Sequence, residues 1–269
     1  MDFQDIIFEA SNETRIAKIT FNTPETRNAI TAERTIDEIE EACKIVNSNR
    51  KINVLIITGT DPAFSSGGNV KDMQEKKGMF DGTPTELMNN YMKYVQRIPK
   101  VLYSVETPII ASVNGPAIGA GFDITMMCDI RIASEKAKFG ETFLNVGIIP
   151  GDGGAYFLPR AVGMAKACEL TFTGDIIDAK EALKIGLVNY VVPHKNLNEK
   201  TMEISKKIAA KPPEALRMSK RLLYMGQNMS MNDLLNQSAA YQSICHYTED
   251  HMEALSAFFE KREAHFKGK

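Results

Sequence analysis

The segment from Pro108 to Ile132 constrains the fold more than any other part of the chain, because it combines a strand, a glycine turn, a helix start and a second strand. Its first six residues, PIIASV, form an apolar run that Asn114-Gly115 closes, which is typical of a strand buried on both faces. Gly119-Ala120-Gly121 is small enough for a ligand to approach the backbone, and a short helix is expected over 122–128. The segment therefore predicts a buried strand that leads to an accessible helix N-terminus.

The N-terminus of that short helix is suited to negative charge. Its first N–H groups have no acceptor within the helix, and the helix dipole adds partial positive charge, so this end stabilises a phosphate or an oxyanion formed during a reaction. Asp123 lies in the first turn. Asp123 either caps the helix beside glycines that only allow close packing, or it belongs to a reaction site. A dinucleotide fingerprint is not favoured, because Ile124 stands where the third glycine is required.

The segments around this one indicate an alternation of strands and helices. A second buried strand is expected over 53–59, and it leads into another glycine loop, Ser65-Ser66-Gly67-Gly68. An amphipathic helix is expected over 32–46, so the pattern predicts an α/β fold. Ligands of such folds bind at the carboxyl ends of the strands. Because both glycine loops follow strands, we expect them to meet at one site.

The two ends of the chain differ in character. A hairpin is expected at the N-terminus, whereas only helices follow the last expected strand at 186–193. These final helices are amphipathic and need a partner surface. We therefore predict a core over 1–195 and a helical region over 196–269. A further helix is expected from a cap at Thr85 to about Leu102, and its Met and Tyr residues are interpreted as core residues.

Composition excludes several classes of function. The net charge is -2 and the basic residues are scattered, so neither nucleic acid nor an anionic membrane is expected as a partner. The N-terminal residues lack the pattern of a signal peptide, and no apolar run reaches eighteen residues, so we expect a cytoplasmic protein. The four cysteines and four histidines lack metal-ligand spacing, so no metal site is expected.

Three motifs, taken together and in order, resemble those of the crotonase superfamily, also called the enoyl-CoA hydratase/isomerase family. They are AFSSGGNVKDM from residue 63, NGPAIGAGFDITMMCDIRIASEKAKFG from residue 114 and GIIPGDGG from residue 147. The resemblance covers nearly the whole chain. It implies a crotonase-type spiral of repeated ββα units with a C-terminal helical region. It also implies that an acyl-coenzyme A thioester is the substrate and that no separate cofactor is needed.

The resemblance also implies roles for individual residues. The backbone N–H groups of Gly68 and Ala120 would hold the thioester carbonyl and bind it more tightly as it becomes an enolate. Asp123 would be the principal proton-transfer group. Residues implied in substrate binding are Arg27, Ala29, Ser65, Ser66, Gly68, Asn69, Val70, Lys71, Ala120, Phe143, Phe258 and Lys261. Of these, Phe258 and Lys261 would approach the coenzyme A of a neighbouring subunit, because the family forms trimers or hexamers.

The sequence departs from the hydratase pattern at one position. Typical hydratases carry one glutamate where Asp123 stands and another where Phe143 stands, and phenylalanine cannot transfer a proton. Glu141 and Asp152 lie close by in sequence. Either could face the acyl pocket with a raised pKa. Alternatively, Glu141 is a surface or ion-paired residue, and Asp152 is a turn residue that bonds to its own backbone.

The expected reaction is hydration of a 2-enoyl-CoA. An enoyl-CoA or dienoyl-CoA isomerase and a dienoyl-CoA hydratase are the alternatives, because all need the oxyanion hole and differ mainly in their acid–base groups. Another alternative is a family member that binds CoA esters without catalysis. Phe143 favours that alternative, whereas Asp123, Asp152 and the two glycine loops oppose it.

Overall fold

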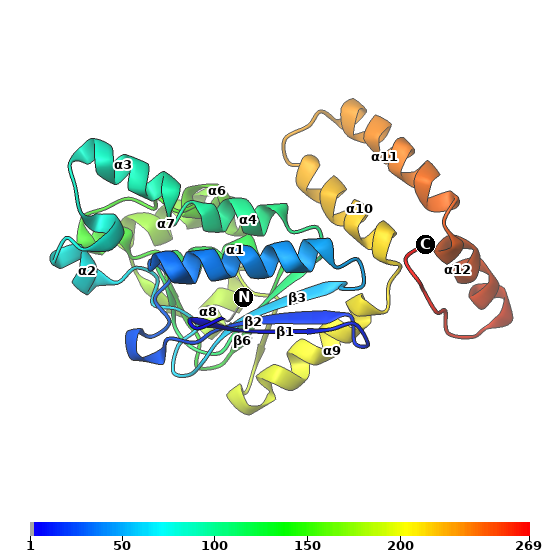
Figure 1. The fold of residues 1–269 in the computed structure, drawn as a ribbon, viewed down its shortest axis with the longest axis horizontal. Coiled ribbons are helices and arrows are strands. Elements are labelled where there is room, and N and C mark those ends of the chain that lie inside the picture. The colour runs from blue at the N-terminus through cyan, green and yellow to red at the C-terminus, as the bar shows by residue number, and fades with distance from the viewer. Residues whose placement is uncertain (1–2) are drawn as a thin grey trace.

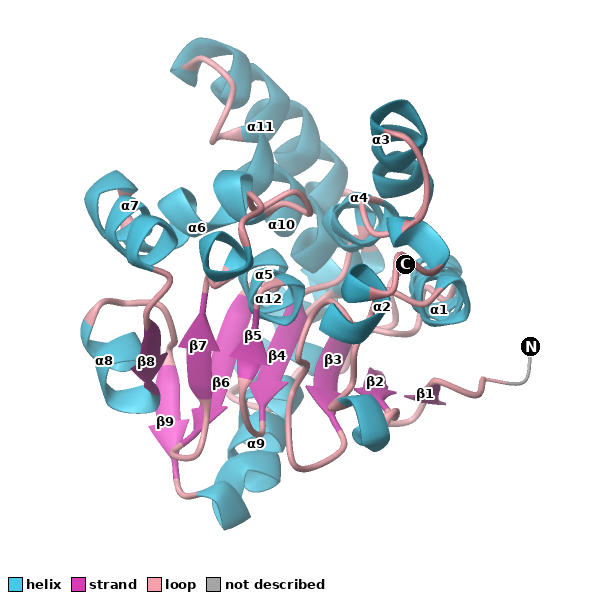
Figure 2. Ribbon diagram, turned by 90° about the vertical axis from the view of Figure 1, so that its left-hand side faces the viewer, coloured by secondary structure: helices cyan, strands magenta, loops and turns pink. Residues whose placement is uncertain are grey.

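A computed structural model describes residues 3–269, and its centre is a six-stranded sheet (Figures 1 and 2). The strand order is β1-β2-β3-β4-β6-β9, in which β1 is antiparallel to β2 and every later pair is parallel. The strands are β1 (Ile6–Ser11), β2 (Ile16–Phe21), β3 (Val54–Gly59), β4 (Ile109–Val113), β6 (Ile130–Ser134) and β9 (Tyr190–Val192). The N-terminal hairpin and both predicted buried strands are confirmed.

A second, three-stranded sheet has the order β5-β7-β8. Its strands are β5 (Ala117–Ile118), β7 (Lys138–Gly140) and β8 (Ile176–Asp178). Along the chain, β4 and β5 precede helix α5 (Ala120–Met127), and β6 and β7 precede helix α6 (Gly154–Val162). In each case the first strand joins the large sheet and the second joins the small one. The predicted architecture of repeated ββα units is confirmed.

Helices cover both faces of the large sheet (Figure 2). Because side chains alternate along a strand, Leu55 and Ile57 of β3 join one core cluster, whereas Val54 and Ile56 join another. The first cluster includes buried residues of α1, and the second includes Leu197 of α9.

The remaining α-helices of the core are α1 (Glu33–Ser48), α2 (Val70–Gln74), α3 (Pro84–Lys93), α4 (Arg97–Ser104), α7 (Met164–Thr173), α8 (Ala179–Lys184) and α9 (Leu197–Ala209). Short 3-10 turns are η1 (Pro24–Thr26), η2 (Gly78–Phe80), η3 (Phe143–Val146) and η4 (His194–Asn196).

The single helix predicted from Thr85 to Leu102 is wrong. Thr83 caps α3 instead, in a capping box with Glu86, because Pro84 fits only the first turn of a helix. Tyr94 then leaves the helical conformation, and a separate helix, α4, starts at Arg97. Within the described chain, α4 buries Ile98 and Leu102, whereas α3 buries none of its side chains.

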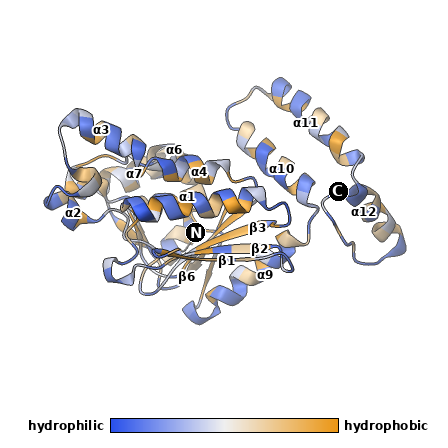
Figure 3. Ribbon diagram, in the orientation of Figure 1, coloured by the Kyte–Doolittle hydropathy of each residue, from blue (hydrophilic) through white to orange (hydrophobic). Residues whose placement is uncertain are grey.

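The last three helices extend away from the sheets (Figure 1). They are α10 (Pro213–Met225), α11 (Met231–His246) and α12 (Glu249–Glu260), and Figure 3 shows that α11 and α12 carry mixed apolar and polar residues while β3 is largely apolar. Since α9 packs on the large sheet, the part that stands apart begins after residue 209. The predicted boundary at residue 196 stays a prediction. None of the helices between residues 3 and 269 has the length and apolarity to cross a lipid bilayer.

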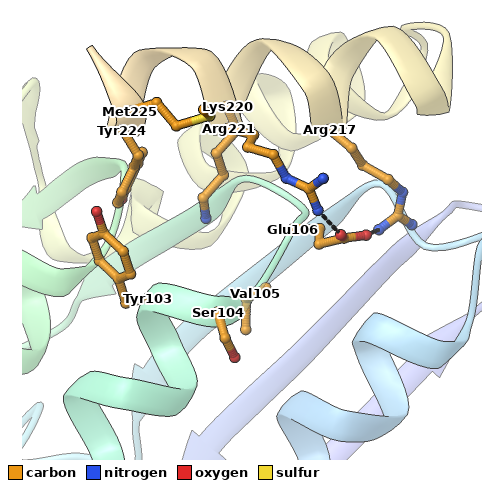
Figure 4. A pocket seen from close by; sticks show the side chains of 9 residues that line it. All are labelled: Tyr103, Ser104, Val105, Glu106, Arg217, Lys220, Arg221, Tyr224 and Met225. Carbon is orange, nitrogen blue, oxygen red and sulfur yellow. Dashed lines mark hydrogen bonds and ion pairs between the residues drawn. The ribbon is translucent and has the colours of Figure 1, made fainter. Parts of the chain in front are cut away.

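A network of charges joins α10 to the core around a cavity of about 310 Å³ (Figure 4). Asp129 accepts hydrogen bonds from Tyr224 Oη at 2.6 Å and from the backbone N–H of Ile109 at 2.6 Å, and it pairs with the buried Lys220 at 2.8 Å. Glu106 pairs with Arg221 in the same cavity. Because these charges pair with one another, we interpret the cavity as part of the contact between α10 and the core.

Tyr224→Phe is expected to lower the free energy of unfolding by about 1.5 kcal/mol, because the phenol donates to a charged, partly buried carboxylate. Urea unfolding of the two proteins measures this difference. The matched control is Tyr247→Phe, since that side chain is 94 % exposed and should change stability little. Equal unfolding midpoints for Tyr224→Phe and wild type would show that the Tyr224 bond adds nothing.

Candidate active site

Three segments meet beyond the carboxyl ends of the central strands. Ala29 pairs with Gly67, and Ser65 pairs with Ala117, each as a parallel bridge. The Ile30 N–H donates to the Gly67 carbonyl at 2.9 Å, which fixes the first contact. The two glycine loops that the sequence placed at one site are therefore side by side.

Two glycines allow this close approach. Gly67 has φ +77°, and a methyl group added there would lie 2.8 Å from the Ala120 nitrogen. A methyl group on Gly121 would lie 2.7 Å from the Ser65 Cβ. Gly68 comes directly after Gly67 in the sequence and therefore lies next to the start of α5. The Ala120 N–H is the first of that helix, so no carbonyl within the helix accepts it.

Three buried carboxyl groups gather beside the start of α5. Asp123 is 0 % exposed in its first turn, Glu141 is 1 % exposed after β7, and Asp152 is 5 % exposed in the loop before α6. Asp123 lies within hydrogen-bonding reach of both of the others and accepts a hydrogen bond from the Gly154 N–H at 2.9 Å. A side chain at Gly154 would collide with carboxylate oxygens of Asp123 and Glu141. The alternative of a surface Glu141 is therefore wrong.

Burial sets the protonation of this cluster. It raises the pKa of Asp123 well above its usual range, and the neighbouring charges of Asp152 and Glu141 raise it further. Burial raises the pKa of Glu141 to about 7, although its hydrogen bond with Asp123 acts in the opposite direction. Burial also raises the pKa of Asp152, against hydrogen bonds from Asp123 and from its own backbone. The cluster therefore holds protons near neutral pH that it can give up or take back.

Several oxygens of the cluster are buried without a hydrogen-bond partner outside the cluster. Apart from one another, no group in residues 3–269 bonds to Asp123 Oδ1, to either oxygen of Glu141 or to Asp152 Oδ1. In the cores of native proteins, buried carboxyl oxygens nearly always have a hydrogen-bond partner. This arrangement suits acid–base chemistry on a substrate that enters the site.

Phe143 lies at the edge of the same region. It begins η3, and its ring would lie 3.8 Å from a methyl group added to Gly119. The ring packs half-buried against the main core. Phe143 thus forms an apolar wall next to the start of α5.

Most of the other predicted binding residues border the glycine loops. The Ser66 N–H donates to the Arg27 carbonyl at 2.9 Å, and the Arg27 side chain is exposed. Asn69 caps α2 by accepting from the Lys71 N–H at 3.1 Å. Val70 is exposed beside it. The structure therefore brings Arg27, Ala29, Ser65, Ser66, Gly68, Asn69, Val70, Lys71 and Ala120 into one region.

Phe258 and Lys261 are not brought to this region within one chain. Both lie at the end of α12, which Figure 1 places at the opposite end of the molecule from α2. Phe258 is exposed, and Lys261 ends the helix in a left-handed conformation. A role for either residue in binding would need a second subunit.

Tyr91 is a residue of this region that sequence reasoning missed. Its ring would lie 3.4 Å from a methyl group added to Gly151, and burial together with the charge of Asp152 raises the pKa of its phenol. The sequence interpretation placed Tyr91 in a core, and its half-buried ring does pack against the main core, but the same ring also lines two cavities beside α3. No pattern in the sequence marks the end of α3 after Lys93, so the sequence did not single out Tyr91.

Comparisons with known proteins agree with this geometry. The family model described as enoyl-CoA hydratase/isomerase matches residues 11–269. The chain is 36 % identical to a crotonyl-CoA hydratase of Syntrophomonas wolfei over 100 % of both proteins, and 35 % identical to a short-chain-enoyl-CoA hydratase of Clostridium acetobutylicum over 97 % of each. A crystal structure of an enoyl-CoA hydratase from Bacillus anthracis has a TM-score of 0.91 and 31 % identity, covering 99 % of this chain and 100 % of that one. Motifs, fold and comparisons together show that the chain belongs to the enoyl-CoA hydratase/isomerase family.

Proposed function

We propose that this enzyme adds water to the double bond of 2-enoyl-CoA thioesters. The observation that carries the proposal is the cluster of Asp123, Glu141 and Asp152, buried beside the loops that hold Gly68 and Ala120. The named hydratases at about 35 % identity over the full chain support it. The thioester is the substrate, and the proposed reaction requires no further cofactor.

In the proposed reaction, the N–H groups of Gly68 and Ala120 donate to the thioester oxygen. Attack of water at C3 moves electrons through C2 to that oxygen, and an enolate forms. Two fixed donors bind an enolate oxygen more tightly than a carbonyl, an effect of about 3 kcal/mol for each donor. A helix N-terminus behind Ala120 adds to this stabilisation.

The carboxyl groups move the two protons of the reaction. Glu141, with a pKa of about 7 and two free oxygens, takes a proton from the attacking water. Protonated Asp123 gives its proton to C2 of the enolate, and the product is a 3-hydroxyacyl-CoA. The proton that Glu141 took then passes to Asp123, which restores both groups, while Asp152 keeps its own proton beside them. In this scheme Glu141 replaces the carboxylate that is absent at Phe143.

Incubation with crotonyl-CoA in heavy water tests the proposal. We expect loss of the enoyl-thioester absorbance, and mass spectrometry should show one deuterium at C2 of 3-hydroxybutyryl-CoA. A shift of the double bond without gain of water would indicate an isomerase instead. Binding of CoA esters without hydration or exchange would indicate a protein that only binds them.

We also propose that the C-terminal helices mediate assembly into a trimer or hexamer. Large apolar side chains are exposed there, including Leu223, Tyr247, Phe258 and Phe259. Such a concentration is typical of a surface that another chain covers. Light scattering after gel filtration should give the mass of three or six chains of 29.9 kDa. A monomer at micromolar concentration would contradict this proposal.

A further inference from the structure

Arg217 of α10 is a buried cation without a close counter-ion. Its side chain is 4 % exposed, and Nη2 donates to the carbonyl of Ile52 at 2.7 Å. Nε and Nη1 have no hydrogen-bond partner among residues 3–269. Native proteins rarely leave a buried charged group unpaired, because the loss of hydration is costly. These two nitrogens therefore require an acceptor that carries negative charge.

Glu106 supplies only part of that charge. Its Oε2 is 3.9 Å from Nη1 of Arg217, which is beyond hydrogen-bond distance. The same carboxylate pairs with Arg50 at 2.8 Å and with Arg221, and Figure 4 shows Glu106 between Arg217 and Arg221. Burial lowers the pKa of Arg217, and the charge of Arg50 lowers it further. Arg217 thus shares a carboxylate that two other cations already use.

The charges around Arg217 include one more cation than carboxylates. Four charged side chains line the cavity of Figure 4, and they are Glu106, Arg217, Lys220 and Arg221. The ion pairs that continue from them reach three more, which are Arg50, Asp129 and Glu214. In this set four cations face three carboxylates, and Arg217 is the cation without a close partner. A single negative charge in the cavity would balance the set.

The cavity that Arg217 lines has room for an anion. Its volume of about 310 Å³ far exceeds the space of one water molecule and lies at the lower end of the volumes of small-molecule sites. A compact ligand therefore fits it. Guanidinium N–H groups form short, strong hydrogen bonds with carboxylate and phosphate oxygens, so an oxyanion matches the donors that Arg217 presents.

We infer that the cavity between α10 and the core binds a small oxyanion, either inorganic phosphate or a small carboxylate. Its oxygens accept from Nε and Nη1 of Arg217, while Lys220 and Arg221 add positive charge. A ligand that binds only the folded chain stabilises it, so the anion strengthens the contact of α10 with the core. None of the three carboxyl groups of the candidate active site lines this cavity, and the inference does not depend on the proposed reaction.

Calorimetric titration of the full chain with sodium phosphate, and separately with sodium acetate, tests the inference. Sodium chloride keeps the ionic strength constant, so that general screening does not contribute. We expect saturable binding of one anion per chain, and the anion that binds more tightly shows whether the site takes phosphate or carboxylate. Absence of saturable binding of both anions up to about 20 mM, well above the dissociation constant of about 1 mM of a weak site, would overturn the inference.

Two variants at the cavity should change this affinity in opposite directions. Arg217→Met keeps an unbranched stem but removes the donors, so the anion should bind at least about tenfold more weakly. Glu106→Gln removes a negative charge from the wall, so the anion should bind at least about threefold more tightly. Lys180→Met, at an exposed position of α8, is the control and should leave the affinity unchanged.

The outcomes of these variants separate the cavity from other anion sites. Unchanged affinity in both cavity variants, as in the control, would show that the anion binds elsewhere on the surface and would refute the inference. Urea unfolding shows whether each variant is folded. If Arg217→Met does not fold, Glu106→Gln alone decides, because a site beside Glu106 must gain affinity for an anion when that charge is removed.

Discussion

Asp123→Asn is expected to lower kcat for crotonyl-CoA by about a thousandfold, because general acid–base groups contribute about 10²–10⁴ in rate. Asparagine keeps the size of the side chain but has no carboxyl proton to give. The Gly154 N–H, at 2.9 Å from the wild-type carboxylate, still finds an amide oxygen as its acceptor. The loss should therefore come from proton transfer and not from collapse of the site.

Steady-state kinetics and butyryl-CoA binding separate these causes. In the Asp123→Asn variant, kcat should fall while the dissociation constant for butyryl-CoA changes little. Asp175→Asn is the matched control, because Asp175 is exposed in the turn before β8. If Asp123→Asn kept more than about a tenth of the wild-type kcat, the main proton-transfer group would have to be another member of the cluster.

Glu141→Gln is expected to stabilise the fold at pH 8 by up to about 3 kcal/mol, which follows from a pKa raised from 4.5 to about 7 at about 1.4 kcal/mol per pH unit. The raised pKa means that the folded chain binds more protons than the unfolded chain between these two values. The wild type therefore loses stability as pH rises from about 4.5 to about 7. Glutamine is neutral and avoids this loss.

The pH dependence of urea unfolding tests this result. The stability advantage of Glu141→Gln should be largest above pH 7 and should shrink toward zero near pH 4.5. The same variant should hydrate crotonyl-CoA more slowly, since it lacks the proposed base. Glu13→Gln, at an exposed turn position, is the control and should show no such pH dependence. An advantage that did not change with pH would argue against a buried, ionising Glu141.

The sequence predicted those elements whose local pattern is strong. The runs that became β3 and β4 are almost wholly buried, so their apolar character identifies them. By contrast, β5, β7 and β8 have two or three residues each and carry no periodicity. Pairing between distant segments creates them, and a single sequence does not show such pairing.

The candidate site likewise has parts that the sequence predicted and parts that it did not. The motif around Asp123 placed it at a helix start, and the glycine loops were expected to meet, because local chemistry determines both. The meeting of Asp123 with Glu141 and Asp152 depends on how β7 and α6 pack around α5, so sequence could only offer it as one alternative. The end of α3 after Lys93 was also misjudged, because the sequence interpretation joined α3 and α4 into one helix.

Asp129 connects the end of α5, the helix of the candidate active site, with α10. It directly follows Cys128, the residue that ends α5, and α5 carries Asp123 in its first turn, about 8 Å of helix rise before Cys128. The same carboxylate anchors α10 through Tyr224 and Lys220. A shift of α10 relative to the core would therefore act on the end of α5, the helix that carries Asp123, through the contacts of Asp129.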